Sequence, residues 1–145
     1  MNALDMLRKD HEGVRELFSE YDTLSGDRPR KNEVARAALH ELELHSRIEE
    51  GLFYPAMRVR TGKDCISLVK NSLNEHHEMD DLIRELRNTD PSDPEFDEKF
   101  QELMENAQEH FGEEEAEMFP RAQMLGNELD KLGLRIQEEK QNAQI

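Results

Sequence analysis

The sequence predicts an all-α protein: an up-down-up-down four-helix bundle with a short C-terminal helix. Apolar side chains recur at alternating spacings of three and four residues in four long segments, as on one face of a helix. Leu, Met, Glu, Lys and Arg are plentiful and β-branched residues are few, which favours helix over strand. Only short stretches separate the segments, and short connections place neighbouring helices antiparallel.

The first two helices each carry one inward-facing stripe and are separated by the helix-breaking residues 25–29. Asn32 is predicted to cap the second helix, and Thr61-Gly62 to end it. The first stripe comprises Leu4, Leu7, His11, Val14, Phe18 and Tyr21, and the second comprises Ala35, Ala38, Leu42, His45, Glu49 and Leu52.

The third and fourth helices follow the same pattern and are separated by a linker over residues 89–94. Pro55 and Pro120 should each kink or end a helix, because proline lacks an N–H and clashes with the preceding turn. A final helix is expected over 128–139, with a frayed tail from Gln141. The third stripe comprises Ile66, Val69, Leu73, His76, Met79, Ile83 and Leu86, and the fourth comprises Phe96, Phe100, Leu103, Ala107, His110, Glu114 and Met118.

Length and charge narrow the domain organisation and the partners. The 145 residues predict a single domain, with a core at about 3–125 and an extension over 126–145. A formal net charge of −15 argues against nucleic acid as a partner, and no apolar run is long enough to span a membrane. The lone Cys65 excludes an internal disulfide and fits a reducing compartment, so a cytoplasmic location is expected.

Polar residues interrupt every apolar stripe. Each stripe contains one histidine, and two of them also contain a glutamate one helical turn later on the same face. A lone buried carboxylate is costly, so a converging set of imidazoles and carboxylates indicates a bound cation. The predicted metal ligands are His11, His45, Glu49, His76, His110 and Glu114.

The spacing of these residues indicates an internal duplication. His11 and His45 are 34 residues apart, as are His76 and His110, and the second pair follows the first at an offset of 65 residues. Two helical hairpins packed about a pseudo-twofold axis would bring both halves of the set to the bundle centre. The arrangement that matches this symmetry is a pair of metal ions bridged by the two carboxylates.

The remaining polar residues near these motifs are predicted to have ordinary roles. His40 and His77 fall off the stripes, and Asp80 is expected at the surface. Met79 and Met118 are predicted to fill the core. A solvated helix face is expected for Glu50, Glu113, Glu115 and Glu117.

At these residues the sequence resembles the hemerythrin-like family, also called the HHE cation-binding domain. The resemblance is carried by Asp10-His11-Glu12, Glu75-His76 and the two His-x-x-x-Glu-Glu motifs that end at Pro55 and Pro120. It implies a four-helix bundle that holds two non-haem iron ions, with an oxo or hydroxo bridge. His11 and His45 would bind one iron, His76 and His110 the other, and Glu49 and Glu114 would bridge both.

The sequence also departs from the oxygen-carrying members of that family. Those proteins have a fifth histidine where this chain has Asp80, and their second bridging carboxylate falls at the position of Glu115. The choice between Glu114 and Glu115 therefore stays open. The resemblance implies a protein, rather than a dedicated enzyme, that binds, senses or reacts with dioxygen, peroxide or nitric oxide, with iron storage or handling as an alternative.

Two other classes of protein are alternatives to this interpretation. A ferritin-like di-iron oxidase carries Glu-x-x-His, but Leu42, Leu73 and Ala107 stand three residues before His45, His76 and His110. A regulatory helical module that binds a protein partner, without a redox-active metal, is the other alternative. Metal analysis distinguishes it, because such a module would hold no iron.

Overall fold

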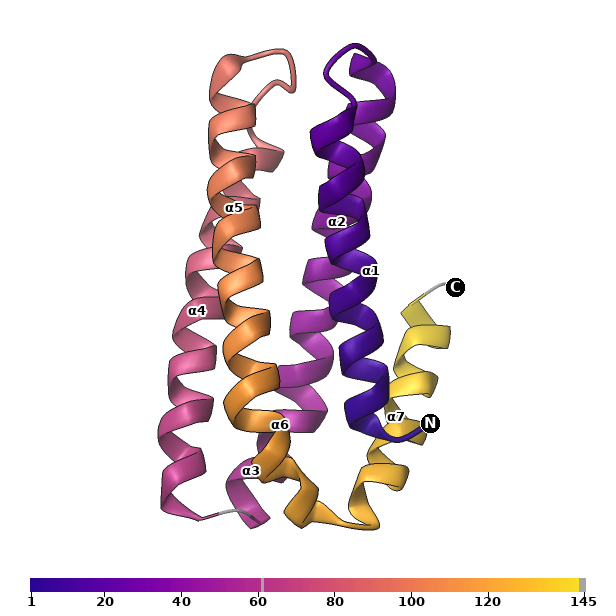
Figure 1. Cartoon of the computed structure of the whole chain (residues 1–145), viewed down its shortest axis with the longest axis vertical. Coiled ribbons are helices and arrows are strands. Elements are labelled where there is room, and N and C mark those ends of the chain that lie inside the picture. Colours follow the sequence, from indigo (N-terminus) through magenta and orange to yellow (C-terminus); the bar gives the residue numbers. More distant parts are fainter. Residues whose placement is uncertain (61, 144–145) are drawn as a thin grey trace.

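The computed structural model describes residues 1–60 and 62–143, and its helices form an elongated bundle (Figure 1). Helices α1 (Ala3–Thr23), α2 (Arg28–Ile48), α4 (Lys63–Arg87) and α5 (Pro94–Glu113) run up, down, up and down. Contacts of α1 with α2 and α5, and of α4 with α2 and α5, close the bundle. The predicted four-helix bundle is confirmed. Thr61, predicted to help end the second helix, lies outside the described residues.

Short acidic or amide side chains start three of the long helices. Asn2 forms a capping box with Asp5 at the start of α1, and Asp93 caps α5. The prediction of Asn32 as the cap of the second helix is wrong. The side chain of Asp27 accepts a hydrogen bond from the Arg30 N–H, and Pro29 fits the first turn, where its missing N–H costs no helical hydrogen bond.

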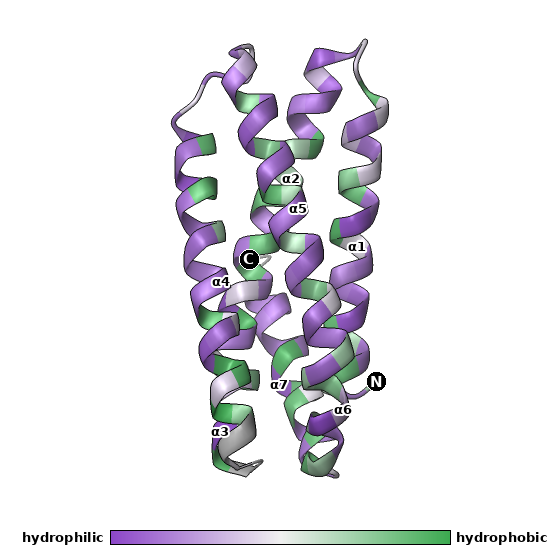
Figure 2. Ribbon diagram, turned by 60° about the vertical axis from the view of Figure 1, so that its left-hand side comes forward, coloured by the Kyte–Doolittle hydropathy of each residue, from purple (hydrophilic) through white to green (hydrophobic). Residues whose placement is uncertain are grey.

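Hydrophobic residues lie mainly on the sides of the ribbons that face the other helices, and hydrophilic residues mainly on the outer sides (Figure 2). The buried residues form two clusters: an upper one around Phe18 and Phe100, and a lower one around Leu7, Phe53 and Phe119. The predicted stripes are largely buried, but Ile66 is 51% exposed. Cys65 faces inward instead, four residues before the buried Val69, and this turns the neighbouring Ile66 toward solvent.

Two π-helical turns lie where the two prolines were predicted to disturb the helices. Regular α-helix ends at Ile48 and at Glu113, and the π turns η1 (Glu49–Phe53) and η2 (Glu114–Met118) follow. The chain continues as α3 (Tyr54–Arg60) and α6 (Phe119–Ala122), each with its proline in second place, and α6 runs into a short 3₁₀ turn, η3 (Gln123–Leu125). Regular α-helix thus gives way to a π turn just before each proline, where a kink or an end was predicted, and the helical chain continues through the prolines. The π turns themselves were not predicted.

The last helix, α7 (Glu128–Ala143), is longer than predicted and packs against α1 and α2 near the chain's N-terminus (Figure 1). Gly133 permits this close approach, because a Cβ atom there would lie 2.7 Å from the carbonyl oxygen of Met1. Helix continues through residues 141–143, where a frayed tail was predicted, while residues 144 and 145 lie outside the described part.

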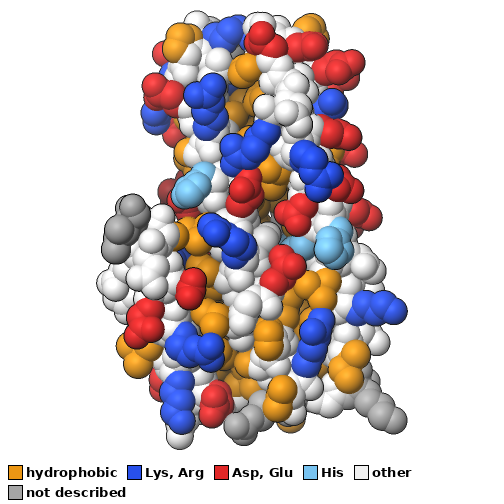
Figure 3. Space-filling model, turned by 180° about the vertical axis from the view of Figure 1, so that it is seen from behind, with side chains coloured by type: hydrophobic (Ala, Val, Ile, Leu, Met, Phe, Trp, Pro, Cys, Tyr) orange, Lys and Arg blue, Asp and Glu red, His pale blue; other side chains and the backbone are white. Residues whose placement is uncertain are grey.

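The outer surface is strongly charged. On the face opposite that of Figure 1, acidic and basic side chains interleave over the whole length of the bundle (Figure 3). Within the described residues, no helix has the length and apolarity needed to cross a membrane.

Candidate metal centre

All six residues predicted as ligands meet in the bundle interior, between the two apolar clusters. One histidine comes from each of the four long helices, and each π turn begins at one of the two glutamates. None of the six is more than 3% exposed. The six polar side chains are therefore shielded from solvent. They lie on helix stripes that are otherwise largely apolar.

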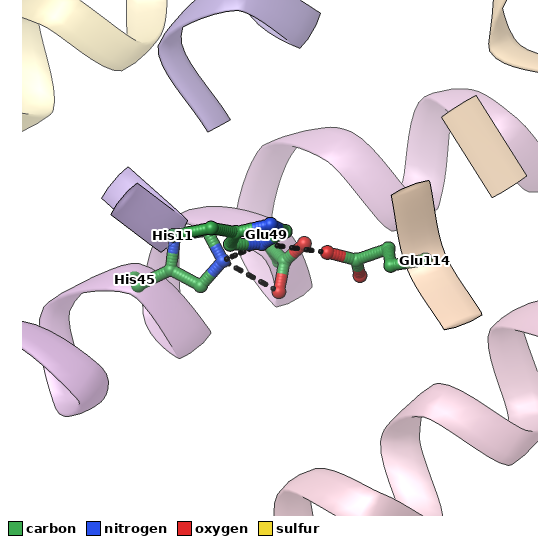
Figure 4. A group of neighbouring side chains, drawn as sticks. All are labelled: His11, His45, Glu49 and Glu114. Carbon is green, nitrogen blue, oxygen red and sulfur yellow. Dashed lines mark hydrogen bonds and ion pairs between the residues drawn. The ribbon is translucent and has the colours of Figure 1, made fainter. Parts of the chain in front are cut away.

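The first group of donors consists of His11, His45, Glu49 and Glu114, whose side chains point toward one another (Figure 4). The Nε2 atoms of His11 and His45 are 3.1 Å apart. His45 Nε2 lies 3.1 Å from Glu49 Oε1, and His11 Nε2 lies 3.1 Å from Glu114 Oε1. Four donor atoms, two from helices α1 and α2 and two from the π turns, thus surround one point.

The second group consists of Glu49, His76 and His110, so that Glu49 belongs to both groups. The Nε2 atoms of His76 and His110 are again 3.1 Å apart. Glu49 Oε1 lies 3.2 Å from His76 Nε2, and Glu114 Oε2 lies 3.5 Å from His110 Nε2. The two glutamates therefore lie between two pairs of imidazoles.

Two buried carboxylate oxygens lack the hydrogen bonds that burial demands. Glu49 Oε2 and Glu114 Oε1 are inaccessible to solvent and accept no hydrogen bond, although Glu114 Oε1 lies within ion-pair distance of His11 Nε2. Such atoms are rare in folded proteins because leaving them unpaired costs about 1–3 kcal/mol each. Imidazole nitrogens and carboxylate oxygens that converge in this way fit a transition-metal cation, which would satisfy both oxygens.

A carboxylate also lies at the outer nitrogen of every histidine. Glu115 Oε2 is 2.6 Å from His11 Nδ1, and Glu75 Oε1 is 2.8 Å from His110 Nδ1. Asp10 Oδ2 is 3.1 Å from His45 Nδ1, and Glu50 Oε2 is 3.2 Å from His76 Nδ1. A carboxylate accepts a hydrogen bond from Nδ1, so Nε2 is the nitrogen of each histidine that could bind a cation.

The prediction that Glu50 and Glu115 belong to a solvated face is wrong. Both are only partly exposed, because the π turns rotate the residue after each inner glutamate toward a histidine of the other hairpin. Glu113 and Glu117 are exposed as predicted. The sequence left open whether Glu114 or Glu115 is the second inner carboxylate. In the structure Glu114 points inward and is 2% exposed.

Tyr54 is a member of the centre that the sequence did not reveal. Its hydroxyl donates a 2.6 Å hydrogen bond to Glu114 Oε2 and lies 3.2 Å from both Glu49 Oε1 and His76 Nε2. The corresponding residue of the other hairpin is Phe119. A tyrosine opposite a phenylalanine in an otherwise repeated motif was the signal available in the sequence.

Burial and mutual charge shift the titration of these groups in the metal-free protein. Burial disfavours a charged imidazole, but the charge of Glu49 and the hydrogen bond to Asp10 outweigh it and raise the pKa of His45 to about 10. Burial and the charge of Glu49 raise the pKa of Glu114. Burial, together with the charges of Glu49 and Glu114, raises the pKa of Tyr54 well above its ordinary value. Protons on these groups thus take the place of a cation.

Other residues considered from the sequence lie outside the centre. His40 and His77 are exposed, and Asp80 is partly exposed on the outer side of α4. Met79 and Met118 are buried in the upper and lower apolar clusters, as predicted.

The fold and the buried donors together define a helical-bundle protein with an intramolecular cation site. A family profile described as the hemerythrin HHE cation-binding domain matches residues 2–122, which is most of the chain. The chain therefore belongs to the hemerythrin HHE cation-binding domain family.

Two curated relatives and one solved structure are similar to most of this chain. The chain is similar to a Nostoc protein named DNA nickase, with 29% identity over 119 residues, which is 82% of this chain but a third of that protein's length. An uncharacterised Mycobacterium tuberculosis protein is 26% identical over 136 residues, covering 92% of this chain and 81% of that protein. A hemerythrin HHE domain-containing protein of Mycobacterium kansasii has the same fold, with a TM-score of 0.83 at 24% identity over 97% of this chain and 86% of that one.

Proposed function

We propose that this chain is a non-haem di-iron protein that binds, senses or reacts with dioxygen or a related small molecule such as peroxide or nitric oxide. The observation that carries the proposal is the pairing of donors: two groups, each with two imidazoles, share Glu49, and Glu114 lies between them. In this proposal His11 and His45 bind one ion, His76 and His110 the other, and the two glutamates bridge both. Mixed imidazole and carboxylate donors suit iron.

A pair of iron ions held this way would supply the redox chemistry, and the chain's own residues set the conditions for it. The aromatic rings of Phe111 and Phe119 stack on His11, with ring centroids 4.1 and 5.7 Å away, and help to exclude water from the centre. A dry interior admits small neutral molecules more readily than charged substrates.

Tyr54 holds a proton inside the centre. Its raised pKa keeps the phenol protonated at neutral pH, and its hydrogen bond to Glu114 fixes the direction of the O–H group. Because the hydroxyl has a single proton, Tyr54 would donate to a small molecule beside Glu49 and His76 only by giving up its hydrogen bond to Glu114.

The nickase name of the Nostoc protein does not change this proposal. Two thirds of that protein's length lies outside the match. The net charge of −15 opposes approach to a phosphate backbone, so we propose no nucleic-acid partner for this chain.

An optical spectrum of the anaerobically reduced protein, taken before and after admission of air, tests the function when iron and zinc are quantified in the same sample. The proposal predicts iron bound at both positions and new charge-transfer absorption after air. Absorption that reverses on evacuation supports binding, and absorption that persists supports sensing, reaction or iron handling. Protein that retains zinc but no iron, or no metal at all, would contradict the proposal and support a structural module.

A further inference from the structure

The two halves of the centre have matching inner donors but different surroundings. We call the place between His11 and His45 the first position and the place between His76 and His110 the second position. Building on the proposed two-ion centre, we propose that the two positions are unequal: the second binds a divalent cation more tightly and is the last to empty.

Around the first position, basic residues neutralise both outer carboxylates. Glu115, the partner of His11, forms a two-pronged ion pair with Arg15, whose Nη1 and Nη2 atoms lie 3.0 and 3.3 Å from the two carboxylate oxygens. Asp10, the partner of His45, pairs with Lys140, which is contributed by α7. The two acidic charges at this end therefore meet two basic ones.

The outer carboxylates at the second position, Glu50 and Glu75, have different neighbours. Among the described residues, no lysine or arginine nitrogen lies within ion-pair distance of Glu50 or Glu75. The ion-pair partners of Glu50 and Glu75 are His76 and His110, and Asp80 lines the same surface groove as Glu50. Asp80 stands at the place that Arg15 occupies in the first hairpin, 65 residues earlier.

Three arginines lie near Glu50 without neutralising it. Arg47, Arg84 and Arg87 line a surface groove together with Glu50 and Asp80. Arg84 pairs with Asp81 at 3.2 Å, and Arg87 pairs with Glu43 at 2.6 Å. The side chain of Arg47 is exposed and takes no part in the ion pairs of the described residues.

The side chains that pack against the inner histidines are also apolar at the first position and polar at the second. Phe111 and Phe119 stack on His11, but the places that correspond to them in the other hairpin hold Ser46 and Tyr54. The ring of Tyr54 lies 5.5 Å from that of His76, with its hydroxyl turned to the imidazole. The first position is thus apolar and neutralised, while the second is polar and negative.

This difference affects cation binding in two ways. A carboxylate that accepts the Nδ1–H bond makes the opposite nitrogen a stronger donor, and an ion pair to arginine or lysine weakens that effect. Excess negative charge also attracts a cation, most strongly in a water-poor interior. Outer partners of metal-binding histidines typically change affinity by about 10- to 100-fold, so we expect the two positions to differ by about tenfold or more.

Titration of the metal-free protein with Co(II) against a competing chelator tests the inference, and ligand variants assign each position. We expect two binding steps in the unaltered protein. His45→Ala should keep the tighter step and His110→Ala should keep the weaker one, with folding checked by circular dichroism. A tighter site that survives in His110→Ala, or equal affinities in the two variants, would overturn the inference.

A second pair of variants leaves every inner donor in place. Arg15→Gln should tighten the weaker step and leave the tighter one, whereas Asp80→Asn should weaken the tighter step and leave the weaker one. Both side chains are partly exposed, so both changes suit the fold. If neither variant moves its own step, the inference is wrong even though two ions bind; if Co(II) does not bind the unaltered protein at all, the proposed function fails as well.

Discussion

The two hairpins of this bundle, α1–α3 and α4–α6, place equivalent donors in equivalent geometry and surround them differently. The Nε2–Nε2 distance is 3.1 Å in each histidine pair, and each hairpin supplies one buried glutamate from a π turn. The outer contacts diverge, with Arg15 in one hairpin and Asp80 at the same place in the other. The two hairpins therefore repeat the inner imidazoles and carboxylates more closely than the charges around them.

Helix α7 adds to this difference from outside the duplication. Its Lys140 reaches Asp10, the carboxylate that orients His45, and no described residue does the same for Glu75 in the other hairpin. Helix α7, which follows the four-helix bundle, thus contacts the half of the centre that contains His45.

Removing an inner glutamate should have the largest effect, and the same effect from either hairpin. In the proposed centre Glu49 and Glu114 bridge both positions, so metal content after anaerobic Fe(II) loading should fall sharply in Glu49→Ala and in Glu114→Ala. We expect affinity losses beyond the roughly 100-fold that an outer partner causes. Elemental analysis measures this, with His40→Ala as an exposed control on α2. Full metal content in Glu49→Ala would contradict the prediction that the two glutamates contribute equally to metal binding.

Tyr54→Phe tests the one polar difference inside the centre. The variant leaves Glu114 Oε2 without its 2.6 Å hydrogen bond, so the metal-free protein should lose about 1–3 kcal/mol of unfolding free energy. Chemical denaturation measures the loss, and Phe119→Tyr is the matched change in the other hairpin. An unchanged unfolding free energy in Tyr54→Phe would mean that its hydroxyl does not support the centre.

The pH dependence of the metal-free protein follows from the raised pKa of His45, about 10, and of His76 and His110. A histidine whose pKa is higher in the folded than in the unfolded chain stabilises the folded state when it is protonated. This contribution is complete below the unfolded pKa of about 6.5. That contribution is lost as the pH rises through the folded value. The thermal midpoint should therefore fall between about pH 7 and pH 10 without metal, and less in the presence of Co(II). A midpoint that rose over this range would contradict these shifts.

Lys140→Met should give the smallest effect, confined to the first position. The Lys140–Asp10 pair is partly exposed, so its loss should cost no more than about 1 kcal/mol of stability. Asp10 would lose its neutralising partner, and the weaker Co(II) step should tighten a few-fold while the stronger step stays fixed. A change in the stronger step instead would show that α7 acts on the other half of the centre.

Periodicity was sufficient to predict the bundle, because the stripes of the long helices are regular. It failed at Ile66, where a phase error of one residue exchanged the roles of Ile66 and Cys65. The cap at Asp27 was missed because Asn32 is also a good capping residue, and the first turn around Pro29 decided between them.

The convergence of the six inner side chains was predictable because polar residues on an apolar stripe are conspicuous. The outer ones were not, since Glu50 and Glu115 look like any exposed glutamate until a π turn changes their direction. π turns have no simple sequence pattern, and Tyr54 fits an apolar stripe as well as any aromatic residue. The ion pair between Lys140 and Asp10 depends on tertiary packing across 130 residues.

Anomalous X-ray scattering from crystals grown with iron tests the central claim most directly. Data collected on either side of the iron absorption edge should show two peaks inside the bundle, one beside His11 and His45 and one beside His76 and His110, with Glu49 between them. Iron found only at the protein surface, with these six side chains free of it, would contradict the account.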